Sequence, residues 1–161
     1  MNYQPSTWGP SAWALMHILA EKSRSQNEVF AKQFARWLYL LKDLLPCERC
    51  RVNYLEHLNI IPIPVSGKRN HFVSWVYKLH KRVNESRNIK KNPSYASVRD
   101  LWHKIYMEVK DPYETYGFWS FLNLLKGTHL NEFMSLLKIM LPWMNVVKTR
   151  QQLCNDDMCN L

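Results

Sequence analysis

The residues with the most evident chemistry are the cysteines, which occur as two separate pairs. Cys47 and Cys50 are separated by two residues in the segment Leu-Pro-Cys-Glu-Arg-Cys, and Cys154 and Cys159 lie near the C-terminal end. A Cys-x-x-Cys pair is typical of half a zinc site or of a dithiol that is oxidised and reduced in turn. The cysteines therefore indicate sulfur chemistry of one of these two kinds.

The local sequence favours a thiolate at Cys47. Pro46 ends a long apolar helical pattern, and the first cysteine pair opens the next predicted helix. The N-terminus of a helix carries partial positive charge, which stabilises an anion and lowers the pKa of a thiol. Arg49 and Arg51 add positive charge beside the pair.

The second pair lies in a polar tail, where Asp156 and Asp157 separate Cys154 from Cys159. Four thiolates could bind zinc, but four intervening residues are at the long end of the usual ligand spacing. A redox relay fits better, in which the tail takes electrons from a client thiol and passes them to the first pair by disulfide exchange. The two acids would complement the arginines beside that pair. Incidental tail cysteines remain the alternative.

An electron acceptor must then be found, and the sequence has neither a glycine fingerprint for dinucleotides nor a P-loop. A helical protein can hold a flat cofactor between aromatic walls with a few polar anchors. Each aromatic residue taken singly is more often part of a core. The side chains available for such a site are Trp8, Trp13, His17, Tyr54, Trp75, His80, Asn84 and Trp102.

The elements that must position these residues are helices. Hydrophobic residues make up 47% of the 161 residues, glycines number only 4, and no β-branched run lies between turn signals, so the composition predicts one all-α domain with an appendage. Pro10 suits a first helical position, Ser25 to Glu28 match a capping box, and Pro46 ends the second helix. The predicted helices cover about residues 10–23, 26–45, 47–58, 70–86, 98–109, 112–126 and 130–140.

The chain divides into a body at 1–110, additional helices at 111–147 and a flexible tail at 148–161. We expect Leu101, Trp102, Ile105 and Tyr106 to face inward from the fifth helix. The additional helices offer apolar area beyond what the body should need, which suggests an interface. The residues that offer this area are Met134, Leu137, Leu141 and Trp143.

The net charge of +9 suits an anionic partner or simply a solvated basic surface. No secretory signal, no presequence and no apolar stretch of roughly 20 residues is visible, so we expect no membrane span and a cytoplasmic location. In that compartment, paired cysteines are more often catalytic or metal-binding than structural.

Three segments in this order resemble the Erv/ALR family of FAD-linked sulfhydryl oxidases. They are Trp-Gly-Pro-Ser-Ala-Trp-Ala-Leu-Met-His (8–17), Leu-Pro-Cys-Glu-Arg-Cys-Arg (45–51) and His-x-x-Val-Asn (80–84). The resemblance covers roughly residues 8–102, and the chain is most similar to the short members encoded by large cytoplasmic DNA viruses.

The resemblance implies a four-helix bundle that holds FAD and a short fifth helix. Two extra C-terminal helices follow these elements here. Cys47 would be the sulfur attacked by a client thiolate, Cys50 the sulfur beside FAD, and Cys154 with Cys159 the shuttle pair. The implied FAD-binding residues are Trp8, Gly9, Trp13, His17, Tyr54, Trp75, His80, Val83, Asn84, Lys91 and Trp102.

The implied reaction oxidises thiol-bearing client proteins, with molecular oxygen as acceptor and hydrogen peroxide as product. The implied protein is a homodimer in the host cytoplasm or virion, without metal or nucleic acid. Departures from the family are Lys81, Arg87, the absent structural cysteines of cellular members and the unmatched segment 111–147. Two alternatives stay open: a helical zinc or nucleic-acid binding module, and an interaction protein that pairs through its last helices.

Overall fold

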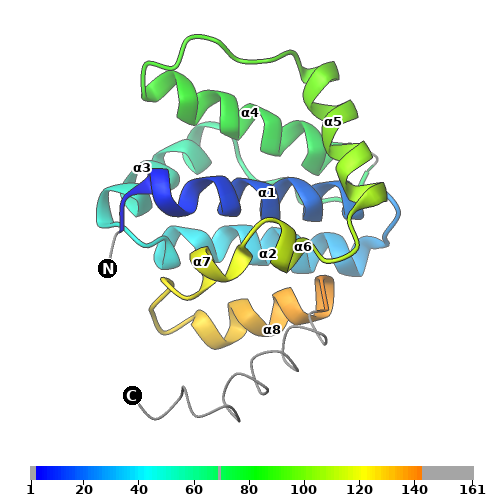
Figure 1. Ribbon diagram of the computed structural model, residues 1–161. Helices are drawn as coiled ribbons and strands as arrows, with labels where there is room; N and C mark the ends of the chain where they lie inside the picture. Colours follow the sequence, from blue (N-terminus) through cyan, green and yellow to red (C-terminus); the bar gives the residue numbers. More distant parts are fainter. Residues whose placement is uncertain (1–2, 69, 143–161) are drawn as a thin grey trace.

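The protein is all-helical, as the composition predicts. The computed structural model describes residues 3–68 and 70–142, and this part of the chain contains eight helices and no strand. Five longer helices come first and three shorter ones follow (Figure 1). They are α1 (Pro5–Ser23), α2 (Glu28–Leu44), α3 (Glu48–Ile60), α4 (His71–Ser86), α5 (Tyr95–Glu108), α6 (Pro112–Thr115), α7 (Phe118–Leu122) and α8 (Leu130–Met140).

Helix α1 is the central element of the fold. It contacts α2, α4, α5 and α7, and Figure 1 shows it between α4 above and α7 below. Three consecutive residues, Ala14, Leu15 and Met16, are all buried, so this helix is apolar on more than one side. A helix that is buried around most of its circumference can present side chains to several neighbours at once.

Helix α2 confirms the predicted apolar stripe. Phe34, Trp37 and Leu38 are fully buried along one face. The C-terminal helix α8 packs on α2, where Phe133 stacks on Trp37 with ring centroids 4.6 Å apart. Arg36 also donates two hydrogen bonds to the Glu132 carboxylate, which joins the two helices at the surface.

The additional helices therefore lie against the body, α7 on α1 and α8 on α2. The expectation of free apolar area was wrong for Leu137, which is fully buried, while Met134 and Leu141 are partly buried against the core. Trp143 lies outside the described residues. The boundary between 1–110 and 111–147 stays a prediction.

Two predicted helix starts were wrong. Helix α1 begins at Pro5, which takes the first-turn position, and Pro10 lies inside the helix. Helix α2 is capped by Asn27, whose side chain accepts a hydrogen bond from Phe30 N at 3.1 Å. The capping box fails because the Glu28 carboxylate accepts from Gly67 N instead.

The later helices differ in detail from the prediction. Helix α5 begins at Tyr95 after a Ser94 cap and contains no fully buried residue. Trp102, Ile105 and Tyr106 pack partly buried against the core as expected, whereas Leu101 is 54% exposed rather than inward. The helix predicted at 112–126 is split into α6 and α7, because Gly117 adopts a left-handed conformation with φ of 58°. The structure thus has three extra helices where two were expected.

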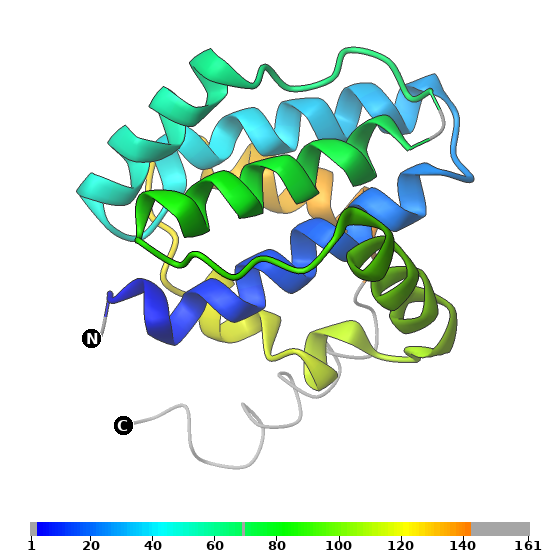
Figure 2. The same ribbon diagram turned by 90° about the horizontal axis from the view of Figure 1, so that it is seen from above.

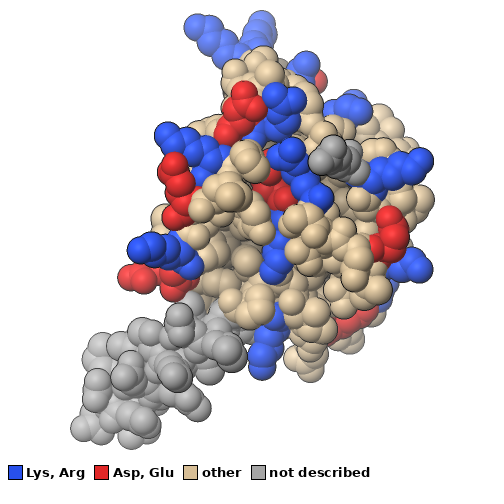
Figure 3. Space-filling view, turned by 90° about the vertical axis from the view of Figure 1, so that its right-hand side faces the viewer, with Lys and Arg blue, Asp and Glu red and all other residues tan. Residues whose placement is uncertain are grey.

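Two surface properties bear on partners. No helix within residues 3–68 and 70–142 is long and apolar enough to cross a membrane. On the face shown in Figure 3, Lys and Arg side chains are spread out with Asp and Glu among them. That face therefore offers no single cationic patch for an anionic partner.

Candidate functional site

The first cysteine pair forms a disulfide at the start of α3. Cys47 is the N-cap residue of that helix, and its Sγ accepts a hydrogen bond from Cys50 N at 3.1 Å. Arg51 Nη1 donates to Leu45 O at 2.7 Å and fixes the turn that connects α2 to α3. Cys50 packs against the core cluster. The predicted helix start at the pair is therefore confirmed, and the pair is present in its oxidised form.

This disulfide forms part of the wall of a cavity of about 970 Å³. The cavity is lined by residues of α1, α2, α3 and α4, by Trp102 of α5 and by Phe121 of α7. Its volume is at the upper end of the range common for small-molecule sites. The predicted site residues that line it are Cys47, Cys50, Trp8, Gly9, Trp13, Tyr54, His80, Val83, Asn84 and Trp102.

Flat rings form two parallel stacks at this site. Trp13 and His80 stack with centroids 3.9 Å apart and an interplanar angle of 6°. His17 and Trp102 stack at 4.8 Å and 3°. The stacks are joined because His17 Nε2 and His80 Nδ1 lie 3.3 Å apart, within hydrogen-bond distance. His17 is buried and does not line the cavity, so it supports two rings that do.

Trp75 and Lys91 are not among the lining residues. Trp75 precedes His80 by five residues on α4, which turns it by about 140° from that face, and its Nε1 donates to Ile61 O at 2.9 Å. Lys91 is exposed beyond the end of α4. The structure does not bring either residue to the cavity. Cys154 and Cys159 lie outside the described residues.

Several lining residues were missed by sequence reasoning. Asn53 and His57 follow Cys50 by three and seven residues, so helical spacing alone could have placed them on its face. Phe121 could not be found this way, because it comes from the appended helix α7 and stacks on Trp8 at 5.6 Å. The other missed lining residues with polar side chains are Ser6, Arg49, Glu56, Ser86 and Arg87.

Burial sets the protonation of the polar groups here. Burial, and then the neighbouring His80, lower the pKa of His17 to about 3, and burial lowers the pKa of His80 to about 4. Burial raises the pKa of Tyr54, whose hydroxyl donates to Leu38 O at 2.8 Å. Burial and then the charge of Arg82 lower the pKa of His57, whose Nδ1 accepts from Arg82 Nε at 3.2 Å. The imidazoles are thus neutral near pH 7.

We expect the free energy of unfolding to fall on acidification below about pH 6.5. The unfolded chain protonates His17 near 6.5, whereas the folded chain resists until about pH 3, so the unfolded state binds more protons in this window. His17 contributes at most about 1.4 kcal/mol per pH unit. Urea unfolding at several pH values should show a flatter profile for His17→Gln than for the exposed control His71→Gln. An unchanged His17→Gln profile would contradict the neutral assignment.

The lining fits a flat cofactor with phosphate groups. Gly9 is buried, yet a Cβ added there would meet no atom within 4 Å, so the glycine keeps open space in the wall. Arg49 and Arg87 supply guanidinium groups that can bind phosphate, and the stacked rings supply flat surfaces.

Within residues 3–68 and 70–142, no three His, Cys, Asp or Glu side chains are grouped to hold a metal ion.

Comparison with known proteins gives two matches. A model of the Erv1 / Alr family matches residues 10–106, which include the disulfide and most of the cavity wall. A protein of Acanthamoeba polyphaga mimivirus, named as a probable FAD-linked sulfhydryl oxidase, is 30% identical over 83 residues. That alignment covers 50% of this chain and 58% of the relative, so the chain spans little more than half of the relative's length. No solved structure matches.

Proposed function

The chain belongs to the Erv1 / Alr family, and on that premise we propose that it oxidises protein thiols to disulfides with FAD as its cofactor. One observation carries the proposal: the Cys47–Cys50 disulfide forms part of the wall of the aromatic cavity. A disulfide in that place can be reduced by a client thiol that approaches from the solvent side, and it can then pass the two electrons inward. The name of the mimivirus relative supports the same chemistry.

The cavity residues have distinct roles in this proposal. Trp13, His80 and Trp102 would hold the flat ring systems of FAD, and Arg49 with Arg87 would bind its phosphates. Bound FAD would supply a two-electron acceptor beside the reduced cysteine pair. The neutral imidazoles keep the aromatic end of the cavity uncharged, which suits an apolar ring.

Thiol exchange would begin at Cys47. A client thiolate bonds to Cys47 Sγ, the bond to Cys50 breaks, and Cys50 leaves as a thiolate on the core side. A second client thiolate then attacks the client sulfur, forms the client disulfide and releases Cys47 as a thiolate. The N-terminus of α3 and Cys50 N stabilise this thiolate, which makes Cys47 a good leaving group. The client loses two electrons and the pair gains two.

We also propose molecular oxygen as the terminal acceptor, so that two thiols and one oxygen give one disulfide and one hydrogen peroxide. The substrates are thiol-bearing client proteins, and the resemblance to viral members supports a location in the host cytoplasm or virion. Pairing of two chains into a homodimer belongs to the same proposal. Light scattering of the purified chain would test the pairing.

The tail cysteines give a separate prediction about clients. If Cys154 and Cys159 carry electrons from client proteins to Cys47, the double replacement Cys154→Ser with Cys159→Ser should slow oxidation of a reduced protein by roughly tenfold or more. Oxidation of dithiothreitol should not change, because a small dithiol reaches Cys47 directly. Oxygen consumption with each substrate measures both rates. Equal slowing of both substrates would exclude a shuttle.

The decisive test of the proposed function is the visible absorption spectrum of the purified chain. We expect a flavin band that bleaches with dithiothreitol in air-free buffer and returns when oxygen is admitted. A chain that stays colourless after FAD is added would overturn the proposal. Zinc analysis would then test the remaining metal-binding alternative.

A further inference from the structure

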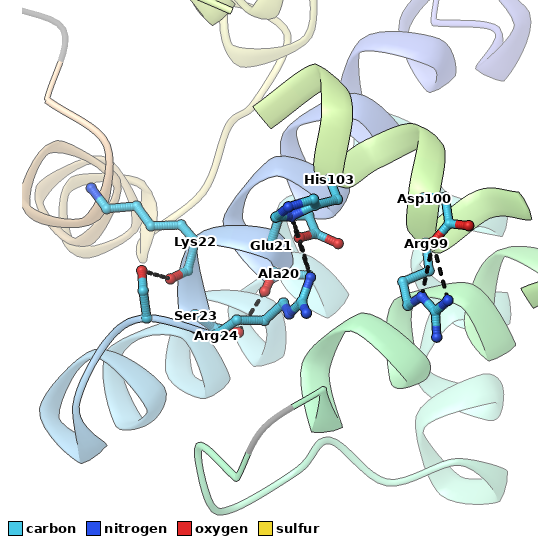
Figure 4. A network of polar contacts seen from close by, with 9 residues as sticks. Ala20, Glu21, Lys22, Ser23, Arg24, Arg99, Asp100 and His103 are labelled. Atoms are coloured by element: carbon cyan, nitrogen blue, oxygen red, sulfur yellow. Dashed lines mark hydrogen bonds and ion pairs between the residues drawn. The ribbon is translucent and has the colours of Figure 1, made fainter. Parts of the chain in front are cut away.

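A buried carboxylate lies outside the cavity, on α1. The Glu21 side chain is only 1% exposed, although it carries a group that is costly to remove from water. Its Oε2 accepts a hydrogen bond from Arg24 Nη1 at 3.1 Å and lies 3.2 Å from His103 Nδ1 (Figure 4). Its Oε1 is buried with no hydrogen-bond partner among the described residues. An apolar side chain would fill this buried position at lower cost, so the carboxylate calls for another explanation than packing.

The partners of Glu21 show what it connects. Arg24 is on the same helix, three residues later, whereas His103 comes from α5. Tyr106 lies one turn after His103, and burial and then the negative charge of Glu21 raise the pKa of its hydroxyl, while a hydrogen bond with Ser25 lowers it. Helix α5 thus contacts the buried acid on α1 through His103.

Helix α5 packs on the body through side chains that are only partly buried, which are Tyr95, Trp102, Ile105 and Tyr106. None of its residues is buried, and Figure 2 shows it beside the C-terminal half of α1. Its aromatic contacts are the stack of Trp102 on His17 and the edge contact of Tyr95 with Tyr77 at 5.3 Å, together with a wider contact of Trp102 with Tyr116 at 6.1 Å. An element without a fully buried side chain depends more on individual polar contacts than a core helix does.

His103, which contacts Glu21, directly follows Trp102 in the sequence. Trp102 is the residue of α5 that lines the cavity. We propose that Glu21 is a positioning residue: through His103 it fixes α5 on α1 and so holds Trp102 against His17 as a wall of the cofactor cavity. This inference rests on the proposed function only where it concerns FAD.

The test uses the full chain with Glu21→Gln, which keeps the size of the side chain and removes its charge. Hydrogen exchange without added FAD should become roughly tenfold faster in peptides from 95–108 and stay unchanged in α2. The control Asp100→Asn removes an exposed carboxylate from α5 itself, which forms an ion pair with Arg99 beside it, and should change neither region. Unchanged exchange in α5 of the Glu21→Gln chain would overturn the proposal.

The second arm asks whether Glu21 acts through Trp102. We expect Glu21→Gln to weaken FAD binding roughly tenfold in the otherwise unchanged chain and by less than about twofold in a Trp102→Ala chain. Equal weakening in both backgrounds would mean a general loss of stability and would overturn the positioning role. If Glu21→Gln fails to fold, His103→Gln removes the same contact from a side chain that is 53% exposed. If the unchanged chain takes up no FAD, the proposed function is refuted, while hydrogen exchange still tests whether Glu21 holds α5 on α1.

Discussion

Replacing Cys50 with serine should reduce thiol oxidation to the uncatalysed rate, a loss of roughly a thousandfold or more. Serine cannot form the disulfide with Cys47, so a client thiolate finds no sulfur–sulfur bond to attack. The loss should be the same for dithiothreitol and for protein clients, because both must reduce this pair. Oxygen consumption with each substrate is the measurement.

The Cys50→Ser result is informative only if the site stays intact. The disulfide closes a very short loop, so we expect its removal to cost only about 2 kcal/mol and to leave the chain folded. The flavin-to-protein ratio after gel filtration should therefore stay near that of the unchanged chain. Glu48→Gln is the matched control, since Glu48 is exposed on the same turn and takes no part in exchange. Residual oxidation of dithiothreitol by a flavin-loaded Cys50→Ser chain would refute the assigned role of the pair.

The sequence predicts most of what the site contains because its motifs lie on regular helices. Trp13 and His17 share a face of α1 by helical spacing, and Cys50 and Tyr54 share a face of α3. What spacing does not give is how these faces meet. The stack of Trp13 on His80 joins residues 67 positions apart, and only the packing of α1 on α4 brings them together.

The errors have local physical causes. Both Pro5 and Pro10 are compatible with the first turn of a helix, so the sequence alone does not tell at which of them α1 begins. Gly117 lies within an amphipathic pattern that continues on both sides, so periodicity misses the break that its positive φ permits. Leu101 is exposed because α5 packs on the core through a face that holds Trp102, Ile105 and Tyr106 and leaves Leu101 outside it.

The appended helices show a different limit of sequence reasoning. Their apolar stripes predict that they must cover something, but not which surface. In the structure, Phe133 stacks on Trp37 of α2, and Phe121 stacks on Trp8 in the cavity wall. The extension is thus part of the core and supplies one wall residue of the cavity, although the family match ends at residue 106.

Substitutions that enlarge the side chain at Gly9 should affect the stability of the fold and the binding of FAD in opposite directions. Gly9 lies inside α1 without a positive φ, so Gly9→Ala should raise the free energy of unfolding by about 0.5–1 kcal/mol. The new methyl group would project into open space rather than against a neighbour. A larger side chain at this position would occupy volume that we assign to FAD.

We therefore expect Gly9→Leu to weaken FAD binding by roughly tenfold to a hundredfold, the effect of overfilling a packed site, without lowering the thermal midpoint of the flavin-free chain. Thr7→Leu is the control, because Thr7 is exposed on the same turn and does not line the cavity. Fluorescence titration with FAD and thermal unfolding without it measure the two effects separately. If Gly9→Leu binds FAD as tightly as Thr7→Leu does, FAD does not occupy the space beside Gly9. That result would contradict the role proposed for Gly9 in FAD binding. If binding falls while the fold is as stable as before, the glycine is retained for the ligand, since a helix interior by itself favours almost any other residue there.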